Sequence, residues 1–134
     1  MNFSKLNNQP KIRLLLAEDH TILRQGLAKL LGQEADIEIV GEAPNGEVAV
    51  KLAEQVHPDV ILMDMGMPKM DGIEATRRIH SNFPEVRIIG LSMHDEMERA
   101  NVMIAAGASR YITKTGPAQD LIAAIRTCAK ARVA

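Results

Sequence analysis

Three acidic residues stand at the ends of two apolar runs in this sequence. Glu18 and Asp19 directly follow one run, and Asp64 ends another. If the two runs are neighbouring strands of a parallel sheet, their carboxyl ends deliver all three carboxylates to one crevice. Like charges about 4 Å apart repel by roughly 4 kcal/mol at an effective dielectric of about 20, so this cluster requires a cation. Oxygen ligands of this kind favour Mg²⁺, and we expect the backbone carbonyl of Gly66 to complete the ligand set.

Two more polar residues end later apolar runs. Ser92 closes one run with a hydroxyl, and Lys114 follows the last run with an ammonium. At one sheet edge, the cation, ammonium and hydroxyl could stabilise the oxygens of a phosphoryl group while a carboxylate oxygen of Asp64 attacks the phosphorus in line. The sequence therefore predicts an aspartyl-phosphate on Asp64, with Mg²⁺ as the cofactor.

Patterns typical of strands and helices alternate five times along the chain. The predicted strands are 12–17, 37–42, 60–64, 87–92 and 110–113, and the predicted helices are 21–31, 46–56, one between Asp71 and Pro84, 95–106 and one that opens at Pro117. This alternation predicts an α/β fold. Its simplest form is a doubly wound five-stranded parallel sheet, flavodoxin-like (βα)5, with strand order 2-1-3-4-5. That order makes the first and third strands neighbours.

Local signals indicate where particular helices begin and how firmly they pack. Asn45 and Asp71 are expected to cap helices, and Glu74 stands three residues after Asp71 in capping-box spacing. The fourth helix is the weakest, because it has only Met97, Ile104 and small residues to bury. A helix with so little to bury can move at a small cost in free energy.

Composition limits the classes of protein to consider. The 134 residues suit one globular domain, and the net charge of -1 lacks the basic excess of a surface that coats nucleic acid or membrane. Cys128 is the only cysteine, which excludes an internal disulfide and a thiolate zinc cage and suits a reducing cytosol. Residues 1–10 are polar and Asn-rich, so we expect a disordered tail and neither a signal peptide nor a membrane anchor. These features predict a cytoplasmic protein.

Residues 11–132 resemble the receiver domain of bacterial two-component response regulators. The matching positions are Glu18-Asp19, Asp64 with Met67-Pro68 and Asp71-Gly72 after it, Ser92, Tyr111 and Lys114. The resemblance implies that Asp64 is the phosphoacceptor and that Lys114 assists the transfer. It implies that Ser92 and Tyr111 are switch residues, and that Mg²⁺ is held by Glu18, Asp19 and Asp64.

Several segments are similar to regulators of the NarL/FixJ (LuxR-type) subfamily, among them Ala17-Glu18-Asp19-His20, Gly72-Ile73-Glu74-Ala75-Thr76 and Leu91-Ser92-Met93-His94. This similarity implies a transcriptional regulator with a C-terminal helix-turn-helix domain. No such domain is present in this sequence, so DNA would be bound only by a segment outside it. A natural stand-alone receiver is the alternative.

The resemblance also implies the partners and the output. A sensor histidine kinase donates the phosphoryl group, and the domain catalyses only its own phosphorylation and dephosphorylation, so it is not an enzyme in the usual sense. Phosphorylation then reshapes the face formed by the fourth helix, fifth strand and fifth helix, and a homodimer forms on phosphorylation. No membrane partner is expected.

Three rival functions are less consistent with the residues. A flavin-binding electron carrier needs a hydroxyl-rich phosphate loop and aromatic stacking partners, whereas the loop here is acidic and aromatic residues are 2% of the chain. A haloacid-dehalogenase phosphatase needs a second aspartate two residues after its nucleophile, where this chain has Gly66. A phosphorylation-independent interaction module would not need Asp64 together with Lys114.

Two further expectations concern the rim of the crevice. The histidines lack the spacing of a zinc motif, and His20 and His94 are expected to flank the acidic residues. Gly66 has no side chain to cover the phosphoryl site, so water should reach an aspartyl-phosphate readily.

Overall fold

The computed structural model describes residues 10–92 and 97–133, with side chains described except at 97–98 and 131–133. The strands are β1 (Ile12–Ala17), β2 (Ile37–Ala43), β3 (Val60–Asp64), β4 (Arg87–Ser92) and β5 (Arg110–Thr113). The helices are α2 (Thr21–Gly32), α3 (Gly46–Val56), α4 (Gly72–Asn82), α5 (Met97–Ala106) and α6 (Ala118–Val133). The predicted tail lies outside the described residues, apart from residue 10.

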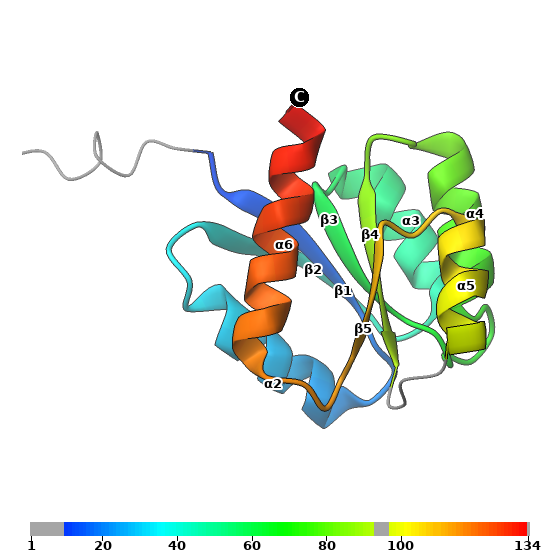
Figure 1. The fold of residues 1–134 in the computed structure, drawn as a ribbon, viewed down its shortest axis with the longest axis horizontal. Helices are drawn as coiled ribbons and strands as arrows, with labels where there is room; N and C mark the ends of the chain where they lie inside the picture. The colour runs from blue at the N-terminus through cyan, green and yellow to red at the C-terminus, as the bar shows by residue number, and fades with distance from the viewer. Residues whose placement is uncertain (1–9, 93–96, 134) are drawn as a thin grey trace, which may run out of the picture.

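The five strands form one parallel sheet in the order β2-β1-β3-β4-β5. Helices α2 and α6 cover one face, and α3, α4 and α5 cover the other (Figure 1). The predicted doubly wound, flavodoxin-like sheet is confirmed. Because β1 and β3 pair directly, their carboxyl ends lie side by side.

Burial on both faces explains why the central strands read as continuous apolar runs. In β3, Val60 and Leu62 pack in the layer with α2 and α6, while Ile61 and Met63 pack in the layer with α3, α4 and α5. All five residues of β3 are buried, including Asp64 at its end. The core therefore extends to the edge of the sheet where the acidic residues stand.

The predicted helix caps are present at both positions. Asn45 Oδ1 accepts a hydrogen bond of 3.0 Å from the Val48 amide, and Asp71 Oδ1 accepts one of 2.9 Å from the Glu74 amide. The Glu74 carboxylate does not complete a capping box. It pairs instead with Arg77 and Arg78 on the same helix.

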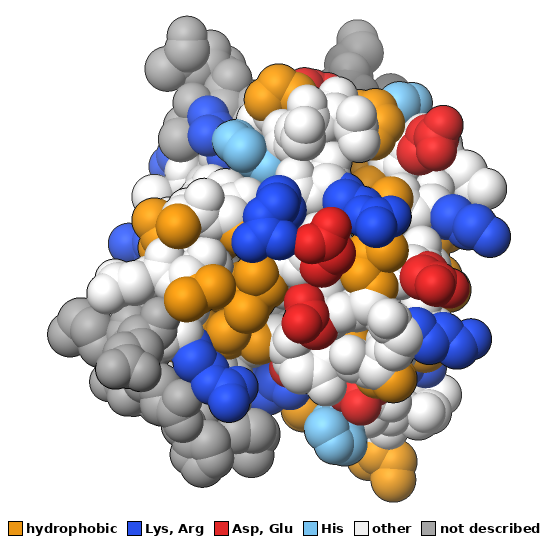
Figure 2. All heavy atoms as spheres, turned by 90° about the vertical axis from the view of Figure 1, so that its right-hand side faces the viewer, with side chains coloured by type: hydrophobic (Ala, Val, Ile, Leu, Met, Phe, Trp, Pro, Cys, Tyr) orange, Lys and Arg blue, Asp and Glu red, His pale blue; other side chains and the backbone are white. Residues whose placement is uncertain are grey.

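Figure 2 shows the face of the molecule formed by α4 and α5, where charged side chains of both signs surround smaller apolar areas.

The expectation that Ile104 is buried in the fourth helix was wrong. Ile104 is 48% exposed, and its neighbour Met103 is fully buried. The reason lies in β4, because Met103 packs over Gly90, where a Cβ atom would lie 2.7 Å from the Met103 methyl carbon. A glycine inside a central strand marks a close approach of this kind. The side chain of Met97 lies outside the described part of the chain.

None of the helices in the described residues is both long and apolar enough to cross a bilayer. Cys128 is buried in the layer of α2 and α6, and burial raises the pKa of its thiol.

Candidate functional site

Glu18 and Asp64 are brought together by the pairing of β1 with β3. Ala17 pairs with Met63, so the next residue in each chain segment is one of these two acids. Their relative exposures are 1% for Glu18 and 6% for Asp64. Two carboxylates are thus held in a nearly water-free corner of the sheet, where each needs a positive partner.

Lys114 supplies that positive partner from the end of β5. Its Nζ lies 2.5 Å from Glu18 Oε1 and 2.9 Å from Asp64 Oδ1, and its side chain is 5% exposed. The Lys114 amide donates a hydrogen bond of 2.6 Å to the Ser92 carbonyl, which fixes the backbone beneath the ammonium. Burial alone would lower the pKa of Lys114, but the hydrogen bonds and charges of both carboxylates outweigh it and raise that pKa above its ordinary value.

Asp19 and His20 extend the cluster toward solvent. His20 Nδ1 lies 2.9 Å from Glu18 Oε2 and 3.3 Å from Asp19 Oδ1. The hydrogen bond to Glu18, with the charges of both acids, raises the pKa of His20. Asp19 Oδ1 is buried without a hydrogen-bond partner. Ligand atoms from Glu18, Asp19, His20 and Asp64 all lie within 4.8 Å of one another, so this acidic cluster could hold a metal ion.

His20 was predicted to flank the acidic residues, and it contacts two of them directly, Glu18 and Asp19. His94 lies outside the described residues. Asp19 Oδ1 is buried without a hydrogen-bond donor, which is unfavourable unless another group binds it. A divalent cation that prefers oxygen ligands would be such a group. The residues present fit a divalent cation.

Arg24 is a positioning residue that sequence reasoning did not single out. Its Nη1 donates a hydrogen bond of 2.7 Å to the Glu18 carbonyl, and its Nε lies 3.2 Å from Glu42 Oε1 at the end of β2. The side chain is 13% exposed. Arg24 thus ties α2 to the ends of β1 and β2. Its signals in the sequence are a basic residue in the first turn of the helix that follows the acidic pair, and the similarity of Arg24-Gln25-Gly26-Leu27 to NarL/FixJ-type regulators.

Ser92 lies beside the phosphoacceptor candidate. Asp64 pairs with Leu91 on β4, so Ser92 is one position further along the neighbouring strand. Ser92 is 8% exposed. Tyr111 pairs with Gly90 and packs, half-buried, in the layer of α3, α4 and α5. Its ring therefore contacts the core beside Gly90.

Two glycines after Asp64 differ in the space around them: Gly66 has room for a side chain, and Gly72 has none. A Cβ atom on Gly66 would meet nothing within 4 Å, and Gly66 is exposed. A Cβ atom on Gly72 would lie 2.0 Å from the Asp64 carbonyl oxygen. The Gly72 amide also donates a hydrogen bond of 3.0 Å to the Met65 carbonyl. Gly72 therefore permits the start of α4 to pack directly beneath Asp64, a role that the Asp71-Gly72 dipeptide alone did not reveal.

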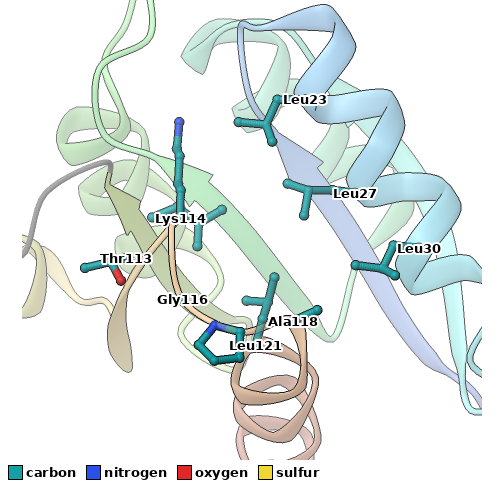
Figure 3. Close-up of a pocket in the computed structure, with 10 residues that line it drawn as sticks. Leu23, Leu27, Leu30, Thr113, Lys114, Gly116, Ala118 and Leu121 are labelled. Carbon is teal, nitrogen blue, oxygen red and sulfur yellow. The ribbon is translucent and has the colours of Figure 1, made fainter.

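A groove of about 160 Å³ adjoins Lys114 on the face of α2 and α6. Leu23, Leu27 and Leu30 form one wall and point from α2 toward Leu121 at the start of α6 (Figure 3). Pro117 contributes to the opposite wall. Two consecutive leucines of α2 thus lie in different environments, because Leu31 is buried in the core while Leu30 is 40% exposed.

Comparisons with known proteins agree with this architecture. The family model described as "Response regulator receiver domain" matches residues 14–126. The chain is 39% identical over 123 residues to the transcriptional regulatory protein DegU of Brevibacillus brevis, covering 92% of this chain and 52% of that protein. It is 44% identical over 119 residues to the transcriptional regulatory protein LiaR of Bacillus subtilis (strain 168), covering 89% and 56%.

A solved structure gives the same picture. A two-component response regulator of the LuxR family from Aurantimonas sp. SI85-9A1 superposes with a TM-score of 0.87 at 34% identity, covering 91% of this chain and 87% of that chain. The chain spans about half the length of the curated relatives it matches.

Proposed function

Because this chain belongs to the response regulator receiver domains, of the NarL/FixJ type, we propose that Asp64 accepts a phosphoryl group from a sensor histidine kinase. The observation that carries this proposal is the position of Lys114, whose Nζ lies 2.9 Å from Asp64 Oδ1 and also contacts Glu18. A buried carboxylate with an ammonium and a candidate metal cluster beside it is equipped to attack phosphorus.

Mg²⁺ is the cofactor that we propose for this site. Glu18, Asp19 and Asp64 would hold it with their carboxylates, together with the backbone carbonyl of Gly66. When bound, Mg²⁺ neutralises carboxylate charge and draws electron density from the oxygens of the phosphoryl group.

The residues of the chain carry the transfer itself. An oxygen of Asp64 forms a bond to phosphorus as the bond from phosphorus to the donor nitrogen breaks, and the leaving imidazole keeps the electron pair and takes up a proton from solvent. The Lys114 ammonium stabilises the negative charge on the phosphoryl oxygens. Ser92, one position beyond the partner of Asp64 on β4, donates its hydroxyl to one of these oxygens. The domain catalyses only this reaction and the hydrolysis that reverses its effect.

We further propose that phosphorylation moves the face of α5, β5 and α6. Attraction of Ser92 to the phosphoryl group shifts the loop after β4, and Tyr111 rotates on β5. Two observations support this proposal: Met103 is the one fully buried large side chain among the described residues of α5, and Val102 and Ile104 are 44% and 48% exposed. Coupling of this kind is limited to roughly 1–3 kcal/mol.

The proposal for the whole protein rests on its relatives. DegU and LiaR are transcriptional regulatory proteins, and this chain matches 52% and 56% of their lengths. We propose that this receiver controls a helix-turn-helix domain in a cytoplasmic transcription regulator, and that DNA is bound only by that domain. We also propose that phosphorylation favours a homodimer. The exposed side chain of Leu30 on α2, which lines the apolar groove, supports a contact on this face.

Mass spectrometry after incubation with acetyl phosphate tests the central proposal. The expected result is one added phosphoryl group in the presence of Mg²⁺, none with a chelator, and none in Asp64→Asn. The Asp71→Asn variant is the matched control, because it changes an aspartate to asparagine at a helix cap that asparagine also serves. Labelling retained in Asp64→Asn would refute Asp64 as the acceptor.

A further inference from the structure

The candidate metal cluster contains one nitrogen ligand that an oxygen-only site lacks. His20 Nδ1 lies 2.9 Å from Glu18 Oε2 and 3.3 Å from Asp19 Oδ1. Two ligands that bind one ion at about 2.1 Å, side by side, lie roughly 3 to 3.4 Å apart. The distance from the imidazole to Asp19 lies within this range, and the 2.9 Å hydrogen-bond contact with Glu18 lies just below it.

The backbone holds the imidazole in this place. The His20 amide donates a hydrogen bond of 3.0 Å to Glu18 Oε2, and the His20 carbonyl accepts one of 2.8 Å from the Arg24 amide. His20 is the N-cap residue of α2, but its side chain makes no cap hydrogen bond. The ring is thus free of a helix-capping role, and at 70% exposure it can bind an ion without losing favourable core contacts.

The carboxylate oxygens of the cluster lie on two sides, and the Lys114 ammonium contacts those on one side only. Lys114 occupies Glu18 Oε1 and Asp64 Oδ1, on one side of the cluster. Glu18 Oε2 faces His20, and Asp19 Oδ1 is buried without a hydrogen-bond partner. A second cation on this side would therefore meet two carboxylate oxygens and one imidazole nitrogen.

We propose that His20 is a direct ligand for divalent transition metals such as Mn²⁺ and Ni²⁺, which bind with Glu18 and Asp19 and compete with Mg²⁺. This inference rests on the metal site of the proposed function and adds its selectivity. Mg²⁺ retains water in preference to nitrogen ligands. Mn²⁺ and Ni²⁺ accept imidazole, and their affinity for a mixed nitrogen and oxygen site rises from Mn²⁺ to Ni²⁺.

The His20→Asn variant removes the ring nitrogen and preserves the fold, because asparagine is among the best N-cap residues. His57→Asn is the matched control. His57 precedes β3 at the opposite end from Asp64 and has a φ of 47°, which asparagine tolerates. Mg²⁺ and Ni²⁺ binding to the full chain would be measured by calorimetry at mildly alkaline pH, and pulsed electron paramagnetic resonance would detect nitrogen bound to Mn²⁺.

We expect His20→Asn to weaken Ni²⁺ binding by about tenfold or more and to weaken Mg²⁺ binding far less, so that the ratio of Ni²⁺ to Mg²⁺ affinity falls. The ¹⁴N coupling to Mn²⁺ should be present in the parent and in His57→Asn and absent in His20→Asn. This signal separates direct coordination from an indirect effect through the hydrogen bond to Glu18.

An unchanged ratio of Ni²⁺ to Mg²⁺ affinity, or a ¹⁴N coupling that persists in His20→Asn, would overturn the inference. If Asp64 is still phosphorylated with Mg²⁺ in that case, the proposed function stands. A parent chain that binds Ni²⁺ through His20 but never accepts a phosphoryl group would overturn the proposed function and leave the metal inference supported.

Discussion

Lys114 and Asp64 lie far apart in the sequence, yet Lys114 Nζ stands 2.9 Å from Asp64 Oδ1. The same ammonium contacts Glu18, so one positive charge serves two buried carboxylates. Removal of the ammonium would leave both buried carboxylates without their cationic partner. The strand order of the sheet creates this relationship, because it brings the ends of β1, β3 and β5 to one edge.

Replacement of Lys114 by methionine should affect both stability and phosphorylation. Methionine keeps much of the side-chain volume, but it removes the ammonium that contacts both carboxylates. We expect the free energy of unfolding to fall by about 2–3 kcal/mol in the absence of metal, and the rate of phosphorylation to fall by about a hundredfold. Urea unfolding and mass spectrometry measure the two effects.

The Lys114→Arg variant should also be impaired, because the planar guanidinium fork cannot reproduce a compact ammonium. Lys130→Met is the control, since Lys130 is exposed on α6. Full phosphorylation by Lys114→Met would contradict the role assigned to the ammonium.

Gly72→Ala should displace the backbone of Asp64 or the start of α4. The added methyl group would lie 2.0 Å from the Asp64 carbonyl oxygen, so either that carbonyl or the start of α4 must move. We expect a loss of about 1–3 kcal/mol in the free energy of unfolding and slower phosphorylation in the molecules that remain folded. Thermal unfolding and initial rates at a temperature well below the midpoint measure these effects.

The matched control for this change is Gly26→Ala. Gly26 lies within α2, and an added Cβ atom there meets nothing within 4 Å. Alanine should therefore stabilise the chain by about 0.5–1 kcal/mol and leave phosphorylation unchanged. Equal stability changes in the two variants would show that the contact beneath Asp64 is unimportant.

Gly66→Leu should prolong the life of the phosphorylated state. The position is exposed and has open space around it, so the larger side chain can be accommodated without repacking. A leucine beside the phosphoryl group should slow the approach of water and thus hydrolysis. The decay of the phosphorylated species, followed by mass after removal of acetyl phosphate, measures this effect. A decay rate equal to that of the parent would count against the open position as the route for water.

Arg126→Met should reveal an acid-sensitive contribution to stability. The hydrogen bond from Arg126 holds the pKa of Asp36 below its ordinary value of 3.8. A carboxylate whose pKa is lower in the folded state stabilises the fold above its unfolded pKa, and this stabilisation is lost as pH falls through the folded value. The parent should therefore exceed the variant in urea midpoint near neutral pH, and this difference should vanish as pH falls below 3.8. A difference that is independent of pH would refute the prediction.

The positions of the strands could be predicted from the sequence for a physical reason. A strand covered on both faces, such as Val60–Asp64, must be apolar throughout until it reaches the edge. The observed strands match the predicted ranges except that β2 extends by one residue, to Ala43. The last helix begins at Ala118, one residue after the predicted Pro117. Such small shifts depend on hydrogen bonds that residue types do not specify.

The candidate site was predictable where strand order alone decides position. The gathering of Glu18, Asp64 and Lys114 at one edge follows from that order. The contact of His20 with two acids does not, because it depends on the side-chain conformation and on the turn that leads into α2. The burial of Met103 in place of Ile104 was hidden for a similar reason, since it depends on the gap that Gly90 leaves in a neighbouring strand.

The distance along the chain between Glu18 and Lys114 has a consequence for synthesis. These two residues are separated by 96 positions, and every acidic member of the cluster precedes the amine. A nascent polypeptide that has left the ribosome only as far as β4 carries the acids without their counter-ion. A chain that ends before Lys114 therefore lacks the ammonium that both buried acids contact, and on the proposed function we expect it not to accept a phosphoryl group.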